Sequence, residues 1–265
     1  KYLGLAGHPR VQEAAKAAID HYGTSVSASR PVAGERPFHG ALEDAIARTY
    51  GVPGAVAFVS GHATNVSTIG YLMGPRDLVL HDAYIHNSTI VGADLSGARR
   101  MTFEHNDPHA LEALLARHRP DFERVLVVVE GLYSMDGDIP PLPAIIDAKR
   151  RHGAWLMVDE AHSFGTVGAR GLGLSEHFGI DANEVDIWMG TLSKSLAGCG
   201  GFIAGPAPLV EMLRYLAPGF LYSVGMPPPV AGAAQQALEI MQEEPERVEA
   251  LHTNSQRFLQ GANEC

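Results

Sequence analysis

Short apolar runs alternate with amphipathic stretches along the chain, which is typical of a sheet whose parallel strands are joined by helices. The run 124–130 contains five consecutive apolar residues, Val125 to Val129, and predicts a strand buried on both faces. Similar runs predict five more strands, at 55–60, 78–81, 155–159, 186–190 and 201–204. Helical spacing predicts helices over 9–22, 39–50, 64–73, 108–118, 142–152, 206–216, 228–243 and 246–259. We therefore expect an α/β fold with a mostly parallel central sheet and helices on both of its faces.

The 265 residues, 46% of them apolar, suffice for one large α/β domain with a small appendage. We assign residues 1–240 to the large domain. A new helix begins after Pro245, so residues 241–265 are expected to start a smaller C-terminal domain that is largely missing. The first residues resemble the interior of a domain and the last ones follow a helical pattern. We therefore expect segments to be absent at both ends.

Composition narrows the class of protein. The formal net charge of −10 argues against nucleic acid as a partner, because phosphate binding favours a basic face. The two cysteines, Cys199 and Cys265, give no disulfide framework and fit a reducing cytosol best. No apolar run of about eighteen residues predicts a transmembrane helix, and no signal peptide opens the sequence. We expect a cytoplasmic protein without a metal site.

Chemically useful side chains follow two of the predicted strands. Ligands of open α/β sheets bind beyond the carboxyl ends of the strands. Asp159 and His162 follow one strand, and a cationic heterocycle would pair with a carboxylate leaving a buried strand; alternatively, Asp159 only caps a loop. Lys194 follows another strand, after the hydroxyls of Thr191 and Ser193, and a desolvated lysine there could form a Schiff base. The competing interpretation is an ordinary solvated lysine.

Three more strand ends carry weaker signals. The segment 60–65 joins a strand to a helix, and exposed amides with the helix dipole favour an anion there, although a glycine turn before a helix is common. His86 could stack on an aromatic ring, or its segment could simply cap a helix through Asn87 or Ser88. Ser134 lies in a Met-Asp-Gly turn and could be a turn residue only.

Taken together, these motifs resemble one known family. The resemblance rests on three motifs: Glu130-Gly131-Leu132-Tyr133-Ser134-Met135-Asp136-Gly137, Asp159-Glu160-Ala161-His162 and Gly190-Thr191-Leu192-Ser193-Lys194. The chain resembles the α-oxoamine synthases, which are fold-type I enzymes that use pyridoxal 5′-phosphate (PLP). That family includes 8-amino-7-oxononanoate synthase, 2-amino-3-ketobutyrate CoA ligase, 5-aminolevulinate synthase and serine palmitoyltransferase. The resemblance spans nearly the whole chain and implies the aminotransferase class I/II fold.

The resemblance also implies catalytic roles. Lys194 is expected to carry PLP as a Schiff base, and Asp159 to pair with the pyridinium nitrogen. His86 is expected to stack on the ring, while His162 and Ser134 approach its phenolic oxygen.

Further residues are implied for the phosphate. The amides of Gly61, His62 and Ala63 are expected to hold it, helped by the Thr191 hydroxyl. Ser223 matches a residue that reaches the phosphate of the neighbouring subunit, so the resemblance implies a homodimer with shared active sites. His39 matches a family pattern without a definite role. Three positions depart from the pattern: position 62 is usually aromatic, position 193 is often Gly, and position 225 is more usually Ser.

The implied reaction joins an amino acid to an acyl thioester, from acyl-CoA or an acyl carrier protein, with loss of carbon dioxide and formation of an α-amino ketone. Serine, alanine and glycine all stay open as the amino acid. An aminotransferase or carbon–sulfur lyase would share Asp159 and Lys194 without needing the thioester. A non-catalytic subunit, or a doubly wound domain with another ligand, are the alternatives of different class.

Overall fold

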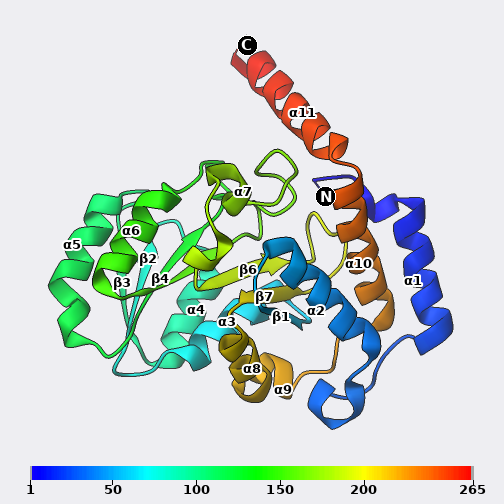
Figure 1. The fold of residues 1–265 in the computed structure, drawn as a ribbon, viewed down its shortest axis with the longest axis horizontal. Coiled ribbons are helices and arrows are strands. Elements are labelled where there is room, and N and C mark those ends of the chain that lie inside the picture. The colour runs from blue at the N-terminus through cyan, green and yellow to red at the C-terminus, as the bar shows by residue number, and fades with distance from the viewer. Residues whose placement is uncertain (1, 264–265) are drawn as a thin grey trace.

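The computed structural model describes residues 2–263 and contains one seven-stranded sheet with helices on both faces (Figure 1). The strand order is β1-β7-β6-β5-β4-β2-β3. Only β7 runs antiparallel, against both β1 and β6. The strand bounds are β1 Gly54–Phe58, β2 Leu78–Asp82, β3 Arg99–Phe103, β4 Val125–Glu130, β5 Trp155–Asp159, β6 Ile187–Thr191 and β7 Gly201–Gly205.

The described part of the chain contains eleven α-helices. They are α1 Pro9–Tyr22, α2 Pro37–Tyr50, α3 Gly61–Leu72, α4 Asn87–Ser96, α5 Pro108–His118, α6 Leu142–His152, α7 Leu174–Phe178, α8 Ala207–Leu216, α9 Pro218–Leu221, α10 Pro228–Glu243 and α11 Glu246–Asn263. Four single turns complete the set: η1 Leu5–Gly7, η2 Arg30–Gly34, η3 Arg119–Asp121 and η4 Ala182–Glu184.

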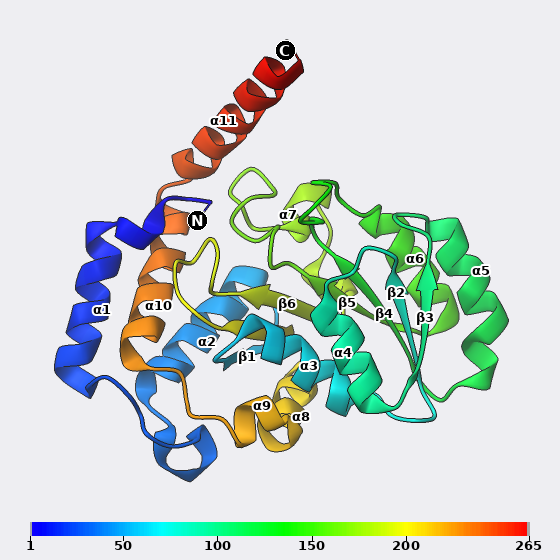
Figure 2. The same cartoon turned by 180° about the vertical axis from the view of Figure 1, so that it is seen from behind.

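Alternate residues of the central strands feed two separate cores. On β4, Val125, Val127 and Val129 belong to the core under α2, α5, α6 and α10. Leu126 and Val128 point to the opposite core, under α3, α4, α8 and α9. Figure 2 shows α3 and α4 lying in front of the sheet when the molecule is seen from behind. Because both faces of a strand are covered, its sequence is a continuous apolar run, as β4 shows.

The predicted α/β fold is confirmed, and all six predicted strands form within a few residues of their expected bounds. One strand was missed. β3 lies at the edge of the sheet and exposes Arg99 and Arg100, so it lacks the apolar run that marked the others. The short helices α7 and α9 were also missed, and α4 was anticipated only through the alternative in which Asn87 or Ser88 caps a helix. The first turn of α3 was expected to be loop, but the helix begins at Gly61 because Ser60 caps it.

The two C-terminal helices differ in how they contact the rest of the chain. α10 packs against α1 and α2, whereas α11 projects away from the sheet (Figure 1). The assignment of residues 241–265 to a second domain remains a prediction, and Cys265 lies outside the described residues. Within residues 2–263, no helix is both long and apolar enough to span a lipid bilayer.

Gly173 lies against a buried carboxylate, so a side chain at this position is expected to lower the free energy of unfolding. Its φ is +84°, and an added Cβ would come within 2.3 Å of a Glu160 carboxylate oxygen. Glu160 is fully buried and accepts hydrogen bonds from the Tyr50 hydroxyl and the Leu174 amide, each at 2.7 Å. We therefore expect Gly173→Ala to lower the free energy of unfolding by about 3 kcal/mol.

Urea denaturation checks this expectation, and Gly179→Ala is the matched control. Gly179 also has a positive φ, of +62°, but nothing lies within 4 Å of its added Cβ. The control should therefore lose only the backbone term, about 1 kcal/mol. Equal losses in the two variants would show that the contact with Glu160 does not matter.

Candidate active site

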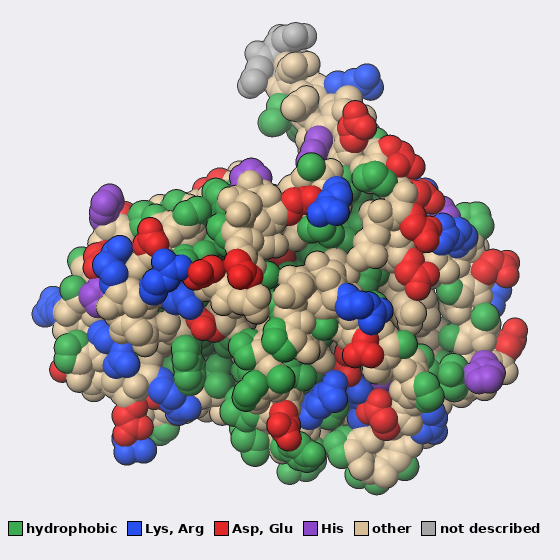
Figure 3. All heavy atoms as spheres, viewed as in Figure 1, with side chains coloured by type: hydrophobic (Ala, Val, Ile, Leu, Met, Phe, Trp, Pro, Cys, Tyr) green, Lys and Arg blue, Asp and Glu red, His purple; other side chains and the backbone are tan. Residues whose placement is uncertain are grey.

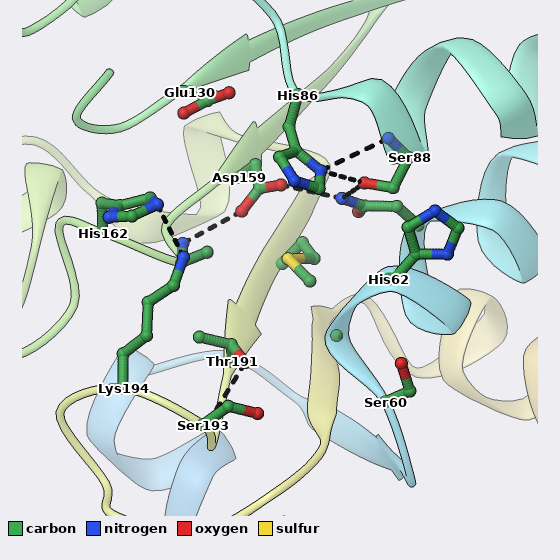
Figure 4. Close-up of a pocket in the computed structure, with 14 residues that line it drawn as sticks. Ser60, His62, His86, Ser88, Glu130, Asp159, His162, Thr191, Ser193 and Lys194 are labelled. Atoms are coloured by element: carbon green, nitrogen blue, oxygen red, sulfur yellow. Dashed lines mark hydrogen bonds between the residues drawn. The ribbon is translucent and has the colours of Figure 1, made fainter. Parts of the chain in front are cut away.

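A cavity of about 240 Å³ lies where the carboxyl ends of β4, β5 and β6 meet the first turns of α3 and α4. Figure 4 shows the side chains that point into it. This is the edge at which ligands bind in open α/β sheets. The lining residues are Ser60, Gly61, His62, Asn65, His86, Ser88, Glu130, Asp159, Ala161, His162, Met189, Thr191, Ser193 and Lys194.

Asp159 ends β5 as a buried carboxylate, 4% exposed, that is held by two donors. Its Oδ1 accepts from the Ala161 amide at 2.9 Å, and its Oδ2 accepts from Asn65 Nδ2 at 2.8 Å. The same Asn65 amide donates to Ser88 Oγ at 2.9 Å, and Ser88 Oγ lies 2.7 Å from His86 Nδ1. This hydrogen-bonded chain fixes the Asp159 carboxylate and the His86 ring relative to each other. It crosses from β5 through α3 to the start of α4 (Figure 4).

Lys194 lies in the loop after β6, with its Nζ 2.6 Å from His162 Nε2. His162 Nδ1 is in turn 2.7 Å from the Tyr2 hydroxyl. When the ammonium of Lys194 donates to Nε2, a neutral imidazole keeps its hydrogen on Nδ1 and donates it to the Tyr2 oxygen. Burial raises the pKa of Tyr2, so its hydroxyl stays neutral. The lysine therefore has a route for passing a proton to an adjacent ring nitrogen.

The start of α3 offers an anion site at the other end of the cavity. Ser60 caps the helix, with its Oγ accepting from the Ala63 amide at 3.3 Å and its carbonyl accepting from the Thr64 amide. The amides of Gly61 and His62 belong to the first turn, whose N–H groups have no acceptor within an α-helix. Together with the helix dipole, they favour a negatively charged group.

Close packing explains why glycine stands at position 61. A Cβ added there would lie 3.0 Å from Thr191 Oγ1, so the backbone of α3 approaches β6 at this point. Thr191 Oγ1 donates to the Gly200 carbonyl at 2.8 Å and accepts from the Ser193 amide at 3.2 Å. The Thr191 hydroxyl thus closes the loop that carries Lys194.

Glu130 places a second carboxyl beside Asp159. The two residues are register partners on the parallel strands β4 and β5, and Glu130 is 5% exposed. Burial, and then the charge of Asp159, raise the pKa of Glu130 to about 8. With its pKa at about 8, Glu130 holds its proton at neutral pH. The cavity therefore presents one carboxylate and one neutral carboxylic acid.

Comparison with known proteins decides the family. The model of the aminotransferase class I and II family matches residues 1–265. The 8-amino-7-oxononanoate synthase of Methylococcus capsulatus is 44% identical over 261 residues, covering 98% of this chain and 67% of that protein. The chain belongs to the α-oxoamine synthase family. The same enzyme of Geobacter sulfurreducens is 45% identical over 240 residues, covering 91% of this chain and 61% of that protein.

Solved structures agree with this assignment to the α-oxoamine synthases. Serine palmitoyltransferase of Sphingomonas wittichii matches with a TM-score of 0.95 at 35% identity, over 99% of this chain and 65% of that one. Serine palmitoyltransferase of S. paucimobilis, solved with bound PLP and myriocin, matches with a TM-score of 0.91 at 34% identity, over 96% and 63% of the two chains. The chain thus spans roughly three fifths to two thirds of the length of these α-oxoamine synthases.

Within this α-oxoamine synthase fold, most of the predicted site residues come together. The cavity is lined by seven of them: Gly61, His62, His86, Asp159, His162, Thr191 and Lys194. His86 also caps α4, in place of the expected Asn87 or Ser88. Its ring faces His62 edge-on, with the ring centroids 6.4 Å apart. The individual roles of these residues remain predictions.

Three predicted residues lie outside this cavity. Ala63 uses its amide in the Ser60 cap. Ser134 is exposed and borders a separate hollow with Tyr84 and Met135, because the turn after β4 leads away from the cavity. Ser223 lies between α9 and α10, and its predicted role belongs to a neighbouring subunit's site. The roles of Ala63 and Ser223 at the phosphate, and of Ser134 at the phenolic oxygen, therefore remain predictions.

Four residues of the site were not singled out from the sequence. Asn65 and Ser88 were visible only as helix-start residues, and their contacts with Asp159 and His86 depend on how α3 and α4 pack. Tyr2 reaches His162 from 160 residues away along the chain. Glu130 stood inside a recognised motif, and its place one strand from Asp159 could have been derived once the strand order was known.

Proposed function

We propose that this α-oxoamine synthase family member binds PLP in the cavity and uses it to condense an amino acid with an acyl thioester, releasing carbon dioxide and forming an α-amino ketone. The proposal rests on the cavity that Asp159 and Lys194 share, which the start of α3 also lines. The named activities of its relatives and the PLP in a structural neighbour support it.

The donor set of the cavity fits PLP. PLP presents a phosphate, a ring nitrogen that can be protonated, and an aldehyde. The Gly61 and His62 amides would take the phosphate, and the close approach of Gly61 to Thr191 leaves no room for a side chain there. Asp159 would take the ring nitrogen and Lys194 the aldehyde. His86, held by Ser88 through its Nδ1, would stack on the ring.

When bound, PLP supplies an electron sink for the α-carbon of the amino acid. The protein's own residues do the rest. The Asp159 carboxylate, fixed by Ala161 and Asn65, would pair with the ring nitrogen. Once the amino group of the substrate has replaced Lys194 Nζ at the aldehyde carbon, the freed Nζ would take the α-proton and could share it with His162 Nε2, 2.6 Å away. Glu130 adds no second negative charge near neutral pH, which leaves Asp159 as the anion facing the ring.

We further propose a homodimer whose sites are shared, in the cytoplasm. Figure 3 shows hydrophobic side chains gathered over α8 and α9. Three large side chains there are each more than half exposed: Tyr215 and Leu216 of α8, and Tyr222 after α9. A cluster of exposed apolar side chains is typical of a protein–protein interface. Ser223 follows Tyr222 directly. His39 Nε2 donates to the Met226 carbonyl at 3.0 Å and so anchors this segment to α2. The low cysteine content supports the cytoplasmic location.

Thiol release tests the reaction. The PLP-loaded protein should liberate free CoA from an acyl-CoA when glycine, alanine or serine is added, and one amino acid should give the fastest release. Without the amino acid, release should fall to the background rate. An aminotransferase or carbon–sulfur lyase would instead give a keto acid with no thiol, and that result would replace the proposed function.

A further inference from the structure

We propose that His105 is a charged clasp, an imidazolium that joins the two loops bordering the active-site cavity, and that it is a positioning residue for PLP binding. This inference rests on the proposed function for its link to PLP. His105 itself lies outside the cavity, just after the edge strand β3. It therefore acts through other residues.

His105 has a carboxylate beside each ring nitrogen and two aromatic side chains packed against its ring. Its Nδ1 lies 2.7 Å from Asp82 Oδ1, and its Nε2 lies 2.8 Å from Asp138 Oδ2. Tyr84 stacks on one face of the ring at a centroid distance of 4.2 Å, and Tyr133 meets it edge-on at 4.5 Å. Carboxylates only accept hydrogen bonds, so both ring nitrogens must carry hydrogen for both bonds to form. Asn106 Nδ2 also lies 3.2 Å from His105 Nε2, but it has Asp138 Oδ2 as an acceptor at 2.8 Å, so the two carboxylates favour the cationic form of the ring.

The electrostatic surroundings agree with that form. The titratable groups that face the ring are Asp82 from the end of β2, Asp138 from the segment after β4, and the phenols of Tyr84 and Tyr133. Burial alone would lower the pKa of His105, but its hydrogen bonds and charge interactions with Asp82 and Asp138 outweigh burial and raise it. Asp82 is itself fully buried, so losing its partner would leave a costly charge.

The clasp connects the loop that ends at His86 with the turn that follows Glu130. On one side, Asp82 also accepts from the Tyr84 and Asn106 amides, each at 2.8 Å, and so shapes the loop that ends at His86. On the other side, the Asp138 carbonyl accepts from the Tyr133 amide at 3.0 Å, which closes the turn that follows Glu130. His86 and Glu130 both line the cavity. Through Asp82 and Asp138, His105 fixes the spacing of these two side chains.

The pH dependence follows from the sign of the pKa shift. A histidine whose pKa is raised by folding stabilises the fold fully at pH values below its unfolded pKa of about 6.5. That stabilisation is lost as pH rises through the pKa of the folded state. A neutral His105 can donate only one of its two bonds, so Asn106, which donates to Asp82 and to Asp138 at 2.8 Å each, is left to bridge the two carboxylates alone. The affinity for PLP should then fall in the alkaline range.

Comparison of His105→Gln with the natural protein isolates this effect. Glutamine can donate to one carboxylate at a time and has no charge, so it mimics neutral histidine at every pH. By equilibrium dialysis with PLP, the variant should bind about tenfold more weakly than the natural protein at pH 6 and less than about twofold more weakly at pH 9. His109→Gln, an exposed position in the first turn of α5, is the matched control and should track the natural protein throughout.

Two further measurements keep the outcomes apart. Nitrogen-15 NMR of the histidine side chains, without PLP, should show both His105 nitrogens protonated at pH 7. Asp138→Asn keeps an acceptor but removes one charge, so it should shift the His105 titration to lower pH and give an intact fold if His105→Gln does not. A neutral His105 at pH 7, or a PLP affinity ratio that does not change with pH, would overturn the clasp. Failure of the natural protein and of His109→Gln to bind PLP would instead defeat the proposed function, while the NMR result would still decide the charge of His105.

Discussion

Replacing Lys194 with alanine is expected to reduce activity by about ten-thousandfold or more and to abolish the visible absorbance band of lysine-bound PLP. The ε-amine is the group that would both hold the aldehyde and take the α-proton, and the cavity offers no other primary amine. His162 stays in contact with Tyr2 when the amine is lost, so the fold around the site should persist. The loss is therefore chemical and not structural.

Absorbance titration with PLP, together with the thiol assay, measures both effects of this change. Lys16→Ala is the control because Lys16 lies on the exposed surface of α1 and pairs only loosely with Glu13, at 3.8 Å. That variant should keep the band and the activity. A Lys194→Ala protein that retained the band would place the cofactor on another of the four lysines of the chain and would contradict the assignment.

Replacing Asp159 with asparagine should have the second largest effect, a fall in activity of about a thousandfold. The amide is nearly the same shape but carries no charge, so it cannot keep a proton on the ring nitrogen. Asn65 Nδ2 would also lose its anionic acceptor, which weakens the chain to Ser88. A thousandfold loss in rate corresponds to about 4 kcal/mol of lost transition-state stabilisation.

Glu130→Gln is the matched control for that change, because Glu130 is the register partner of Asp159 on the neighbouring strand. With its pKa raised to about 8, Glu130 is already neutral at pH 7, and glutamine conserves its shape and neutrality. We expect its activity to fall by less than about tenfold at that pH. Steady-state kinetics of both variants check the contrast, and equal losses would show that the two carboxyls share one role.

The fold was predictable wherever burial on both faces imposed a continuous apolar run. Val125 to Val129 marked β4 in this way, and most of the helices that cover it followed from their spacing, α4 and α9 being the exceptions. β3 could not be predicted because an edge strand needs no such run, and Arg99 and Arg100 are exposed there. The turn before α3 was misread because Ser60 caps the helix three residues earlier than its apolar spacing suggested.

The candidate site could be predicted where its side chains lie at the carboxyl ends of neighbouring strands. Asp159 and Lys194 follow adjacent strands, so the rule for open sheets brings them to one edge. Tyr2 and Asn65 could not be placed by that rule, because they reach the site through the packing of distant segments. Ser134 shows the reverse case: its motif was recognised, but the turn that carries it leads to a neighbouring hollow.

A crystal structure of the protein grown with PLP tests whether Asp159 and Lys194 hold one cofactor between them. We expect density continuous from Lys194 Nζ to the cofactor, the ring nitrogen within hydrogen-bond distance of an Asp159 carboxylate oxygen, and the phosphate at the Gly61 and His62 amides. Cofactor density bound elsewhere, or bound here with Asp159 turned away from the ring nitrogen, would contradict it.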